Sequence, residues 1–373
     1  MTKGILATGG AGYIGSHVVV ELLNAGYRVV VLDNFENSEP EVLDRIEAIT
    51  GKSVGLVAGD VRDCATVERA LRAHKADAVI HLAGKKAVGE SVADPLLYYN
   101  DNLNGAMSLV GAMRAAGVRH LAFSSSATVY GTLQKLPINE AAATGPTSPY
   151  GRTKLMIEEM IEDCTVAWPD FAAISLRYFN PVGAHRSGLI GENPRGTPNN
   201  LFPYVVQTAA GELPFVRVFG DDYLTADGTG LRDYIHVVDL ARGHVAAVAA
   251  LFDPKPAMHR HQRINLGTGK GYTVLQVIAA FSRACGRRIA HKVVARRDGD
   301  IAASVADASL ALDLLGWRAT MGIDRMCMDQ WIFKTQSMAN LDLFGSMSRV
   351  STNVAGLNGS SRTLGMPADL RRH

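Results

Sequence analysis

The segment SPYGRTK (148–154) contains the residues best suited to chemistry. Tyr150 and Lys154 stand four positions apart, so on a helix they share one face. Ser148 suits an N-cap and Pro149 the first helical position, so we expect a helix that begins here. A tyrosine hydroxyl has an ordinary pKa of about 10, and a neighbouring ammonium favours its deprotonated form. Tyr150 is therefore a candidate base that takes a proton from an alcohol near neutral pH.

A third candidate lies in SSSATVYG (124–131), directly after an apolar run. We expect the hydroxyl of Ser126 to bridge Tyr150 and a substrate oxygen, whereas Ser124 and Ser125 satisfy local backbone groups. The Y-x-x-x-K spacing alone is common by chance, and its alternative interpretation is a surface tyrosine beside a solvated lysine. The additional serines at the end of a strand favour a catalytic group.

The stretch TGGAGYIGSH (8–17) is a glycine-rich turn between a strand-like run and a helix-like segment. Such a turn lets the backbone approach a pyrophosphate at a helix N-terminus. The motif alone is weak, but Asp33 ends the next strand-like run, 21 positions after Gly12. A carboxylate there accepts hydrogen bonds from a ribose 2′-hydroxyl and repels a 2′-phosphate, which favours NAD over NADP. Two registers fit the glycines: G-x-G-x-x-G on Gly10, Gly12 and Gly15, and G-x-x-G-x-x-G on Gly9, Gly12 and Gly15.

Short apolar runs alternate with helix-like segments through the first half of the chain. This alternation predicts an α/β fold, a doubly wound parallel sheet of the Rossmann type with helices on both faces. Ligands bind such sheets at the carboxyl ends of the strands. The predicted strands are 4–8, 27–33, 53–60, 76–84, 119–126 and 171–180, and helical patterns cover 17–26, 65–74 and 104–117.

The composition changes after residue 180. We expect 1–180 to form an NAD-binding domain and 181–336 a smaller mixed α/β substrate-binding lobe, with 234–251 returning to the first domain as a strand and a helix. Segment 337–373 is rich in Ser, Gly, Met and Arg without a period. It is predicted to be a disordered or loosely docked tail.

Charge and cysteine content exclude several classes of function. The formal net charge of the 373 residues is only +2, so neither nucleic acid nor a membrane surface is an expected partner. The four cysteines are scattered and the chain opens on a strand-like run, which favours a reducing cytoplasm and no secretory signal. His259 and His261 form the closest histidine pair; we expect them in a solvated loop rather than at a metal, and no metal site is predicted.

Taken together, these motifs resemble the extended short-chain dehydrogenase/reductase family, and within it the enzymes that invert UDP-sugars at C4. The similarity covers roughly residues 3 to 335. The matching stretches are TGGAGYIGSH, LDN, AGDVRD, HLAGKKAVGESV, SSSATVYG, SPYGRTK, RYFNPVGAH, NNLFPYV, DGTGLRDYIHV, INLGTG and RRDGD.

The resemblance implies a role for each matching position. Tyr150 is the base, Lys154 its activator and a ribose contact, and Ser126 their hydrogen-bonding partner. The implied NAD-binding residues are Gly9, Gly12, Tyr13, Ile14, Gly15, Asp33, Asn34, Phe35, Glu36, Asn37, Ser38, Asp60, Val61, Leu82, Ala83, Gly84, Lys85, Lys86, Asp101 and Phe179, with Ser126, Tyr150 and Lys154. The implied UDP-sugar-binding residues are Lys86, Ser126, Tyr150, Asn180, Asn200, Leu201, Phe219, Arg232, Arg297, Asp300 and Ser304.

The implied reaction is reversible and consumes no cofactor. Tyr150 takes the proton of the sugar 4-hydroxyl while hydride passes from C4 to NAD, leaving a 4-keto sugar. The ring turns about its link to UDP, and hydride returns to the other face. UDP-galactose and UDP-glucose are the implied pair, and a homodimer through helices near 100–117 and 150–165 is the implied assembly.

Two positions depart from the family pattern. Asp101 stands where an asparagine often contacts the cofactor, and Asn100 and Asn102 are the alternative candidates. Ser304 stands where some members have a tyrosine beside the sugar. The smaller side chain leaves room near C2, so we expect N-acetylated UDP-sugars to be accepted as well.

Three rival functions deserve comparison. A nucleotide-sugar 4,6-dehydratase usually has Asp-Glu after the strand-five hydroxyl residue, whereas Ala127 and Thr128 follow Ser126 here. A non-enzymatic NAD-binding sensor tends to lose the Tyr–Lys pair, which this chain keeps. A carbonyl reductase that uses free NADPH is disfavoured by Asp33.

Overall fold

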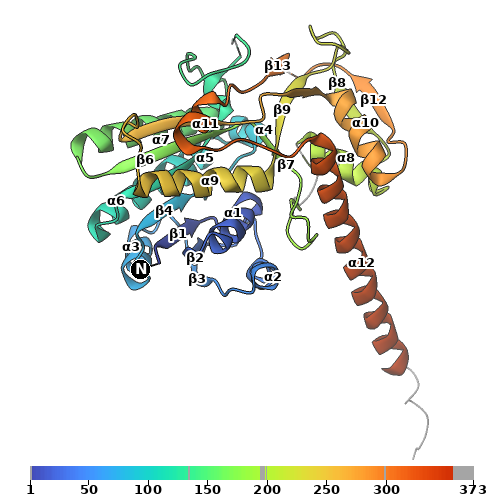
Figure 1. The fold of residues 1–373 in the computed structure, drawn as a ribbon. Coiled ribbons are helices and arrows are strands. Elements are labelled where there is room, and N and C mark those ends of the chain that lie inside the picture. The colour runs from blue at the N-terminus through green and yellow to red at the C-terminus, as the bar shows by residue number, and fades with distance from the viewer. Residues whose placement is uncertain (1, 133–134, 194–197, 199, 298–299, 356–373) are drawn as a thin grey trace, which may run out of the picture.

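The computed structural model describes residues 2–132, 135–193, 198, 200–297 and 300–355, with side chains as far as residue 339. Its main feature is a parallel seven-stranded sheet with helices on both faces (Figure 1). This architecture confirms the predicted doubly wound α/β fold. The strands follow the order β10 (His261–Leu266), β6 (Ala172–Tyr178), β5 (His120–Ser126), β4 (Ala78–His81), β1 (Gly4–Thr8), β2 (Arg28–Asp33) and β3 (Gly55–Ala58).

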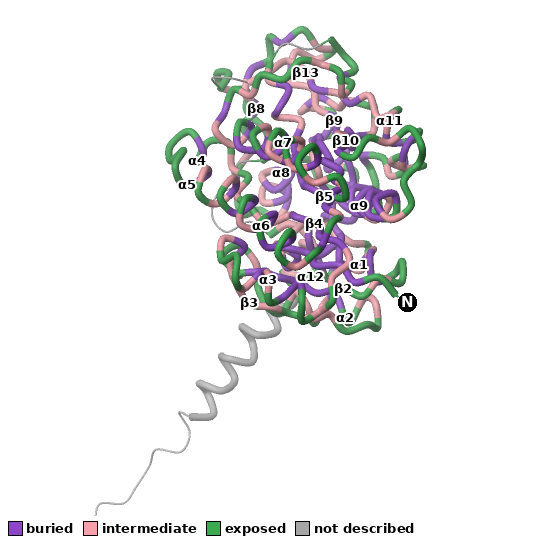
Figure 2. Tube along the Cα trace, turned by 90° about the vertical axis from the view of Figure 1, so that its left-hand side faces the viewer, coloured by how far each residue is buried: buried purple, intermediate pink, exposed green. Residues whose placement is uncertain are grey.

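Successive residues of the central strands point into two separate hydrophobic cores, because side chains alternate along a strand. Ile5 and Ala7 of β1 belong to one core, and Leu6 belongs to the other. Both faces are therefore buried, as Figure 2 shows for the middle of the molecule. The first core is covered by α1 (Tyr13–Asn24), α2 (Glu41–Thr50), α9 (Val237–Phe252) and α11 (Ser309–Leu315), and the second by α3 (Cys64–Ala73), α6 (Gly105–Ala116) and α7 (Pro149–Ala167).

Between β4 and α6 the chain forms three short helical segments that shape one edge of the sheet's carboxyl end. They are α4 (Val88–Ala93), α5 (Pro95–Tyr98) and the π-helical turn η1 (Tyr99–Asn104). A 3₁₀ turn, η2 (Ala127–Tyr130), follows β5 directly. These segments place Asp101 and Asn102 opposite the end of β4 and the start of α7.

The smaller lobe has its own core, which includes the large buried rings of Phe202 and Phe281. It lies beyond one end of the main sheet in Figure 1. Its sheets contain β7 (Asn180–Val182), β9 (Leu231–His236), β11 (Gly271–Thr273) and β13 (Ala303–Ser304), and the pair β8 (Val216–Phe219) and β12 (His291–Val294). Its helices are α8 (Leu201–Ala209), α10 (Val274–Cys285) and α12 (Ile323–Ala355).

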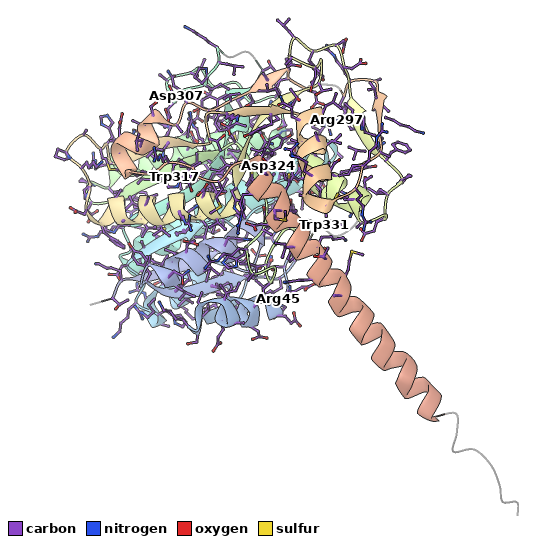
Figure 3. The ribbon with its side chains drawn as sticks, turned by 45° about the vertical axis from the view of Figure 1, so that its right-hand side comes forward. Arg45, Arg297, Asp307, Trp317, Asp324 and Trp331 are labelled. Atoms are coloured by element: carbon purple, nitrogen blue, oxygen red, sulfur yellow. The ribbon has the colours of Figure 1, made fainter. Side chains whose placement is uncertain are left out.

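The segment that returns to the first domain is wider than 234–251. Helix α9 packs against α1, as expected, but β9 lies in the smaller lobe. Strand β10 adds a seventh strand beside β6, and Trp317, just after α11, donates its indole N–H to Asp239 O of α9 at 2.9 Å (Figure 3). The main domain is therefore built from three separate segments of the chain: the part up to β6, the part from α9 to β10, and α11 with Trp317.

Two sequence-based expectations differ from this fold. His261 does not lie in a solvated loop: it begins β10, is buried, and contacts Ser175 Oγ at 2.8 Å and Glu162 Oε2 at 2.9 Å. The tail expected from residue 337 continues α12 as far as Ala355, and 356–373 lie outside the described residues. Within the described part of the chain, no helix combines the length and apolar character that a membrane crossing needs.

Candidate active site

The glycine-rich turn after β1 is packed too tightly for side chains. A Cβ on Gly9, whose φ is +69°, would lie 2.6 Å from Ala83 N, and one on Gly15 would lie 2.1 Å from Gly9 O. Gly12 forms the N-cap of α1 without a side-chain cap, so its first N–H groups are available to a ligand. The turn is therefore a close backbone approach at a helix N-terminus, the arrangement that a dinucleotide pyrophosphate requires.

Asp33 ends β2 beside that turn, and its carboxylate is held from three directions. It accepts hydrogen bonds from Ala11 N at 3.0 Å, from Phe35 N at 2.9 Å and from Ser38 Oγ at 2.9 Å. Phe35 adopts the left-handed region with φ of +58°. Asp33 therefore joins the glycine turn to the 34–38 loop.

Asp60 follows β3 and forms a tight ion pair with Arg62, which the sequence analysis did not single out. Arg62 Nε lies 2.9 Å from Asp60 Oδ1 and its Nη2 lies 2.7 Å from Oδ2. Hydrogen bonding from Arg62 lowers the pKa of Asp60 to about 2. The carboxylate accepts a further bond from Asn34 Nδ2 at 3.1 Å, which ties the ends of β2 and β3 together.

The three candidates at positions 100 to 102 take different roles. Asn100 is exposed, and its Nδ2 donates to Asp101 Oδ1 at 3.2 Å. Asp101 pairs with Arg62 at 2.6 Å, whereas Asn102 is buried and binds the loop after β4. Asn102 Oδ1 accepts from Lys85 N at 2.8 Å, and its Nδ2 donates to Thr153 Oγ1 at 3.1 Å. Asn102 thus links the predicted cofactor loop to the helix that carries Tyr150.

The three predicted catalytic residues come together between β5 and α7. Ser126 ends β5, while Tyr150 and Lys154 lie on successive turns of α7. That helix begins with the expected cap, in which Gly151 N donates to Ser148 Oγ at 3.2 Å. Ser126 Oγ accepts hydrogen bonds from Thr128 N at 3.2 Å and from Thr128 Oγ1 at 3.0 Å, and Ser126 also lies close enough to Tyr150 to influence its pKa. Lys154 Nζ donates to the backbone oxygen of Ser124 at 2.7 Å and lies 5.9 Å from the centre of the Tyr150 ring.

The electrostatics of this group differ from the sequence-based expectation. Burial raises the pKa of Tyr150, and the hydrogen bond from Ser126 acts in the opposite direction. Burial lowers the pKa of Lys154 to about 8, opposed by the charge of Glu158. Lys154 therefore does not by itself make Tyr150 a phenolate here, because the cost of burying the anion dominates.

Glu158 lies one turn beyond Lys154 and is fully buried. It accepts from Ser125 Oγ at 2.5 Å, and Arg177 of β6 donates to it at 3.0 Å and 2.5 Å. The expectation that Ser125 serves only local backbone was wrong, since its partner is this carboxylate. The contacts join β5, β6 and α7 immediately behind the catalytic side chains, and no sequence motif had identified Glu158.

Tyr13 and Lys86 face the smaller lobe. Tyr13 OH donates to Gly183 O at 2.7 Å, and Lys86 Nζ lies 5.5 Å from the centre of the Tyr13 ring. Lys86 also pairs with Glu192 at 2.8 Å. Glu192 comes from the loop of the lobe and was not predicted, although its contact with Lys86 links the two parts of the molecule at the predicted site.

The predicted substrate residues of the lobe come from several of its strands and loops and from the start of one helix. The Arg297 guanidinium lies 4.4 Å from the centre of the Phe219 ring and its Nε lies 3.0 Å from Asp300 Oδ2. Figure 3 shows Arg297 on the lobe, well away from Trp317. Ser304 of β13 pairs in register with Arg232 of β9. Asn180 begins β7, and Asn200 with Leu201 forms the start of α8.

The other predicted cofactor residues surround the same carboxyl edge of the sheet, at varied depth. Val61 and Phe179 are buried, Asn34 and Asn37 are exposed, and Leu82 donates its N–H to Thr8 O at 3.0 Å. Ile14 lies in the first turn of α1, and Gly84, with φ of +145°, approaches Asn102.

Comparison with known proteins agrees with this geometry. The sequence profile of the NAD dependent epimerase/dehydratase family matches residues 5–267. The chain belongs to this family, with the Rossmann-type sheet, glycine turn and Tyr–Lys helix of an NAD-binding enzyme.

Its relatives within the family are UDP-glucose 4-epimerases. The mouse (Mus musculus) enzyme is 54% identical over 89% of this chain and 97% of its own length. The Stenotrophomonas maltophila UDP-glucose-4-epimerase structure, with bound NAD and formylated UDP-arabinopyranose, has a TM-score of 0.88 and 50% identity over 91% of this chain and 99% of its own. The structure of the Bifidobacterium longum UDP-glucose 4-epimerase, in complex with NAD⁺ and UDP, has a TM-score of 0.84 and 51% identity. The match covers 90% of this chain and 98% of that one. These similarities confirm the resemblance found in the sequence.

Proposed function

We propose that this protein interconverts UDP-galactose and UDP-glucose by inverting C4 of the sugar, with NAD as a recycled cofactor. The observation that carries the proposal is the Ser126–Tyr150–Lys154 group at the carboxyl edge of the sheet, in which Ser126 and Lys154 are buried and Tyr150 is partly exposed. Its neighbours, the glycine turn and Asp33, fit the pyrophosphate and a ribose of NAD. The relatives described above are all enzymes of this reaction.

Each residue has a distinct task in this reaction. NAD, when bound beside this group, would supply the hydride acceptor and donor for C4 and a positive charge on the nicotinamide that favours ionisation of Tyr150. Tyr150 receives the proton of the 4-hydroxyl and gives it back to the 4-keto sugar. Ser126 orients both oxygens, and Lys154 places its ammonium beside the ring of Tyr150.

The nucleotide is held while the sugar turns. Arg232 and Arg297 suit the UDP pyrophosphate because a guanidinium donates paired hydrogen bonds to its oxygens. Arg297 contacts both the Phe219 ring and the Asp300 carboxylate, which favours a defined position of its guanidinium. We assign the remaining predicted lobe residues to the uridine and the sugar.

Ser304 is proposed to widen the substrate range to N-acetylated UDP-sugars. It is nearly buried and lies opposite Arg232 in the sheet. Ser304→Tyr is expected to suppress turnover of UDP-N-acetylglucosamine selectively, because the ring fills the space beside C2. Steady-state rates on UDP-glucose and UDP-N-acetylglucosamine check this; an equal loss on both substrates would refute the wider pocket.

The reaction itself is tested by product analysis. Purified protein is incubated without added NAD, once with UDP-galactose and once with UDP-N-acetylgalactosamine. Conversion of both to the gluco forms supports the epimerase, a retained cofactor and the wider pocket. Conversion of UDP-galactose alone rejects only the wider pocket, and no conversion even with added NAD would reject the epimerase.

We also propose a cytoplasmic homodimer. Helices α6 and α7 expose Met107, Met156 and Val166, which are large apolar side chains on the two helices expected at the interface. Burying them against a second copy would remove apolar surface from water. Light scattering of the purified protein distinguishes the dimer from a monomer.

A further inference from the structure

A chain of ion pairs crosses the predicted adenosine end of the cofactor groove. Lys85 Nζ lies 2.5 Å from Glu36 Oε1 and 3.7 Å from Asp101 Oδ2. Arg62 Nη1 lies 2.6 Å from Asp101 Oδ1, and Arg62 also holds Asp60. We call the three pairs Glu36–Lys85, Lys85–Asp101 and Asp101–Arg62 the ionic strap.

The ionic strap connects segments that are far apart in sequence. Glu36 lies in the loop after β2, Arg62 after β3, Lys85 after β4, and Asp101 in η1. These loops stand at the carboxyl edge of the sheet, where a dinucleotide lies in doubly wound folds. The strap begins beside Asp33, whose carboxylate orders the loop that carries Glu36.

The central members of the ionic strap are well shielded from water. Side-chain exposure is 12% for Lys85 and 11% for Asp101, whereas the ordinary surface pair Lys3–Asp77 has 50% and 34%. Exposed pairs contribute little, but shielded pairs that form a network lose less of their attraction to solvent. Asp101 is also one of the two positions where this chain departs from its family pattern.

From this arrangement we propose that the ionic strap closes the adenosine end of the groove and slows the release of NAD. The proposal rests on the proposed function, which places NAD in this groove and requires the reduced cofactor to stay bound until hydride returns. Arg62, which no motif had identified, acts as a positioning residue through Asp101. Lys85 is the central member because it joins the β2 loop to η1.

The test measures how fast NAD leaves the holoenzyme. Protein loaded with radiolabelled NAD is chased with excess unlabelled NAD, and retained label is counted after gel filtration at low and high salt. Release from the natural protein is expected to accelerate with salt, because ions screen the strap. Lys85→Met, which keeps an apolar stem of similar length, is expected to release NAD about three- to tenfold faster at low salt.

Loss of salt dependence separates the strap from a merely structural effect. Lys85→Met is expected to respond much less to salt than the natural protein, and Lys85→Arg to keep slow, salt-sensitive release. Glu36→Gln, which removes one pair, is expected to fall between them. Lys3→Met is the matched control, since it breaks an exposed lysine–aspartate pair away from the groove.

Two outcomes would overturn the proposal that the ionic strap slows the release of NAD. One is a release rate in Lys85→Met equal to that of the natural protein. The other is faster release with an unchanged salt slope in a variant whose thermal unfolding is normal, which would indicate a steric role. Either result leaves the proposed function standing if the natural protein still converts UDP-galactose, whereas absence of bound NAD and of conversion would reject both.

Discussion

Tyr150→Phe is expected to lower kcat for UDP-galactose conversion by about 10²- to 10⁴-fold, the range for loss of a positioned acid–base group. The substitution removes only the phenol hydroxyl and keeps the ring, which is partly buried. NAD should therefore remain bound. Coupled assay of UDP-glucose formation gives kcat, and the absorbance of NAD released by denaturation reports cofactor content.

Tyr27→Phe provides the matched control for that substitution. Tyr27 stacks on Phe252 with ring centres 6.5 Å apart and takes no part in the proposed site. Its variant should keep the activity of the natural protein. If Tyr150→Phe retained more than about a tenth of kcat, the proton of the 4-hydroxyl would have another acceptor, and the assignment of Tyr150 as base would fail.

Much of the fold follows from local sequence patterns. The run GILAT predicted β1 at its observed bounds, and the next strands were each placed within a few residues. Parallel strands that are buried on both faces have nearly continuous apolar sequences. Each can therefore be recognised from its own residues, without knowledge of the strands that pair with it. The cap at Ser148 was equally local, because it depends on residues adjacent in sequence.

Strand β10 was not predicted because its sequence does not carry that signal. HQRINL begins with three polar residues, and His261 and Arg263 are tolerated there only because β6 and α7 supply partners. Arg263 Nε lies 3.4 Å from Glu158 Oε2. The residues that make these polar side chains acceptable in a buried strand lie about a hundred positions away in the sequence. A search for hydrophobic periodicity within a short window does not include them.

The residues of the candidate site also fall into those that local sequence motifs identify and those that only tertiary contacts reveal. Motifs with fixed spacing identified Gly12, Tyr150 and Lys154, since each motif lies on one turn or one helix. Arg62 and Glu158 act through partners on other elements, and only the folded chain brings these together. Their roles depend on tertiary contacts that no local pattern encodes.

The pKa of Tyr150 shows the limit of reasoning from residue spacing. Spacing correctly placed an ammonium on the same helix face, but it does not measure how much water surrounds the hydroxyl. Burial raises the pKa of Tyr150 and outweighs the hydrogen bond from Ser126. Ionisation of Tyr150 must therefore draw on every positive charge near the ring, and this makes Lys154 a sensitive position.

Lys154→Met is expected to lower kcat/KM near pH 7 by about 10- to 1,000-fold, because loss of a neighbouring positive charge raises a pKa by about 1–3 units. The two proteins should also respond oppositely to alkali. The natural protein should lose activity as pH rises through about 8, where burial makes Lys154 give up its proton. The variant has no ammonium to lose, so its activity should rise with pH as more Tyr150 ionises. A pH profile of kcat/KM for both proteins checks this.

The opposite slopes above pH 8 distinguish an electrostatic role from a packing role. Methionine nearly matches the lysine stem but cannot donate to Ser124 O, so some loss of activity would follow from either role. Only loss of the charge changes the sign of the pH dependence. The Glu158–Arg177 ion pair is common to both proteins, and His81 stays neutral because burial lowers its pKa to about 3. If Lys154→Met lost activity yet declined above pH 8 like the natural protein, the alkaline limb would belong to another group. Lys154 would then hold β5 and α7 together without assisting the proton transfer.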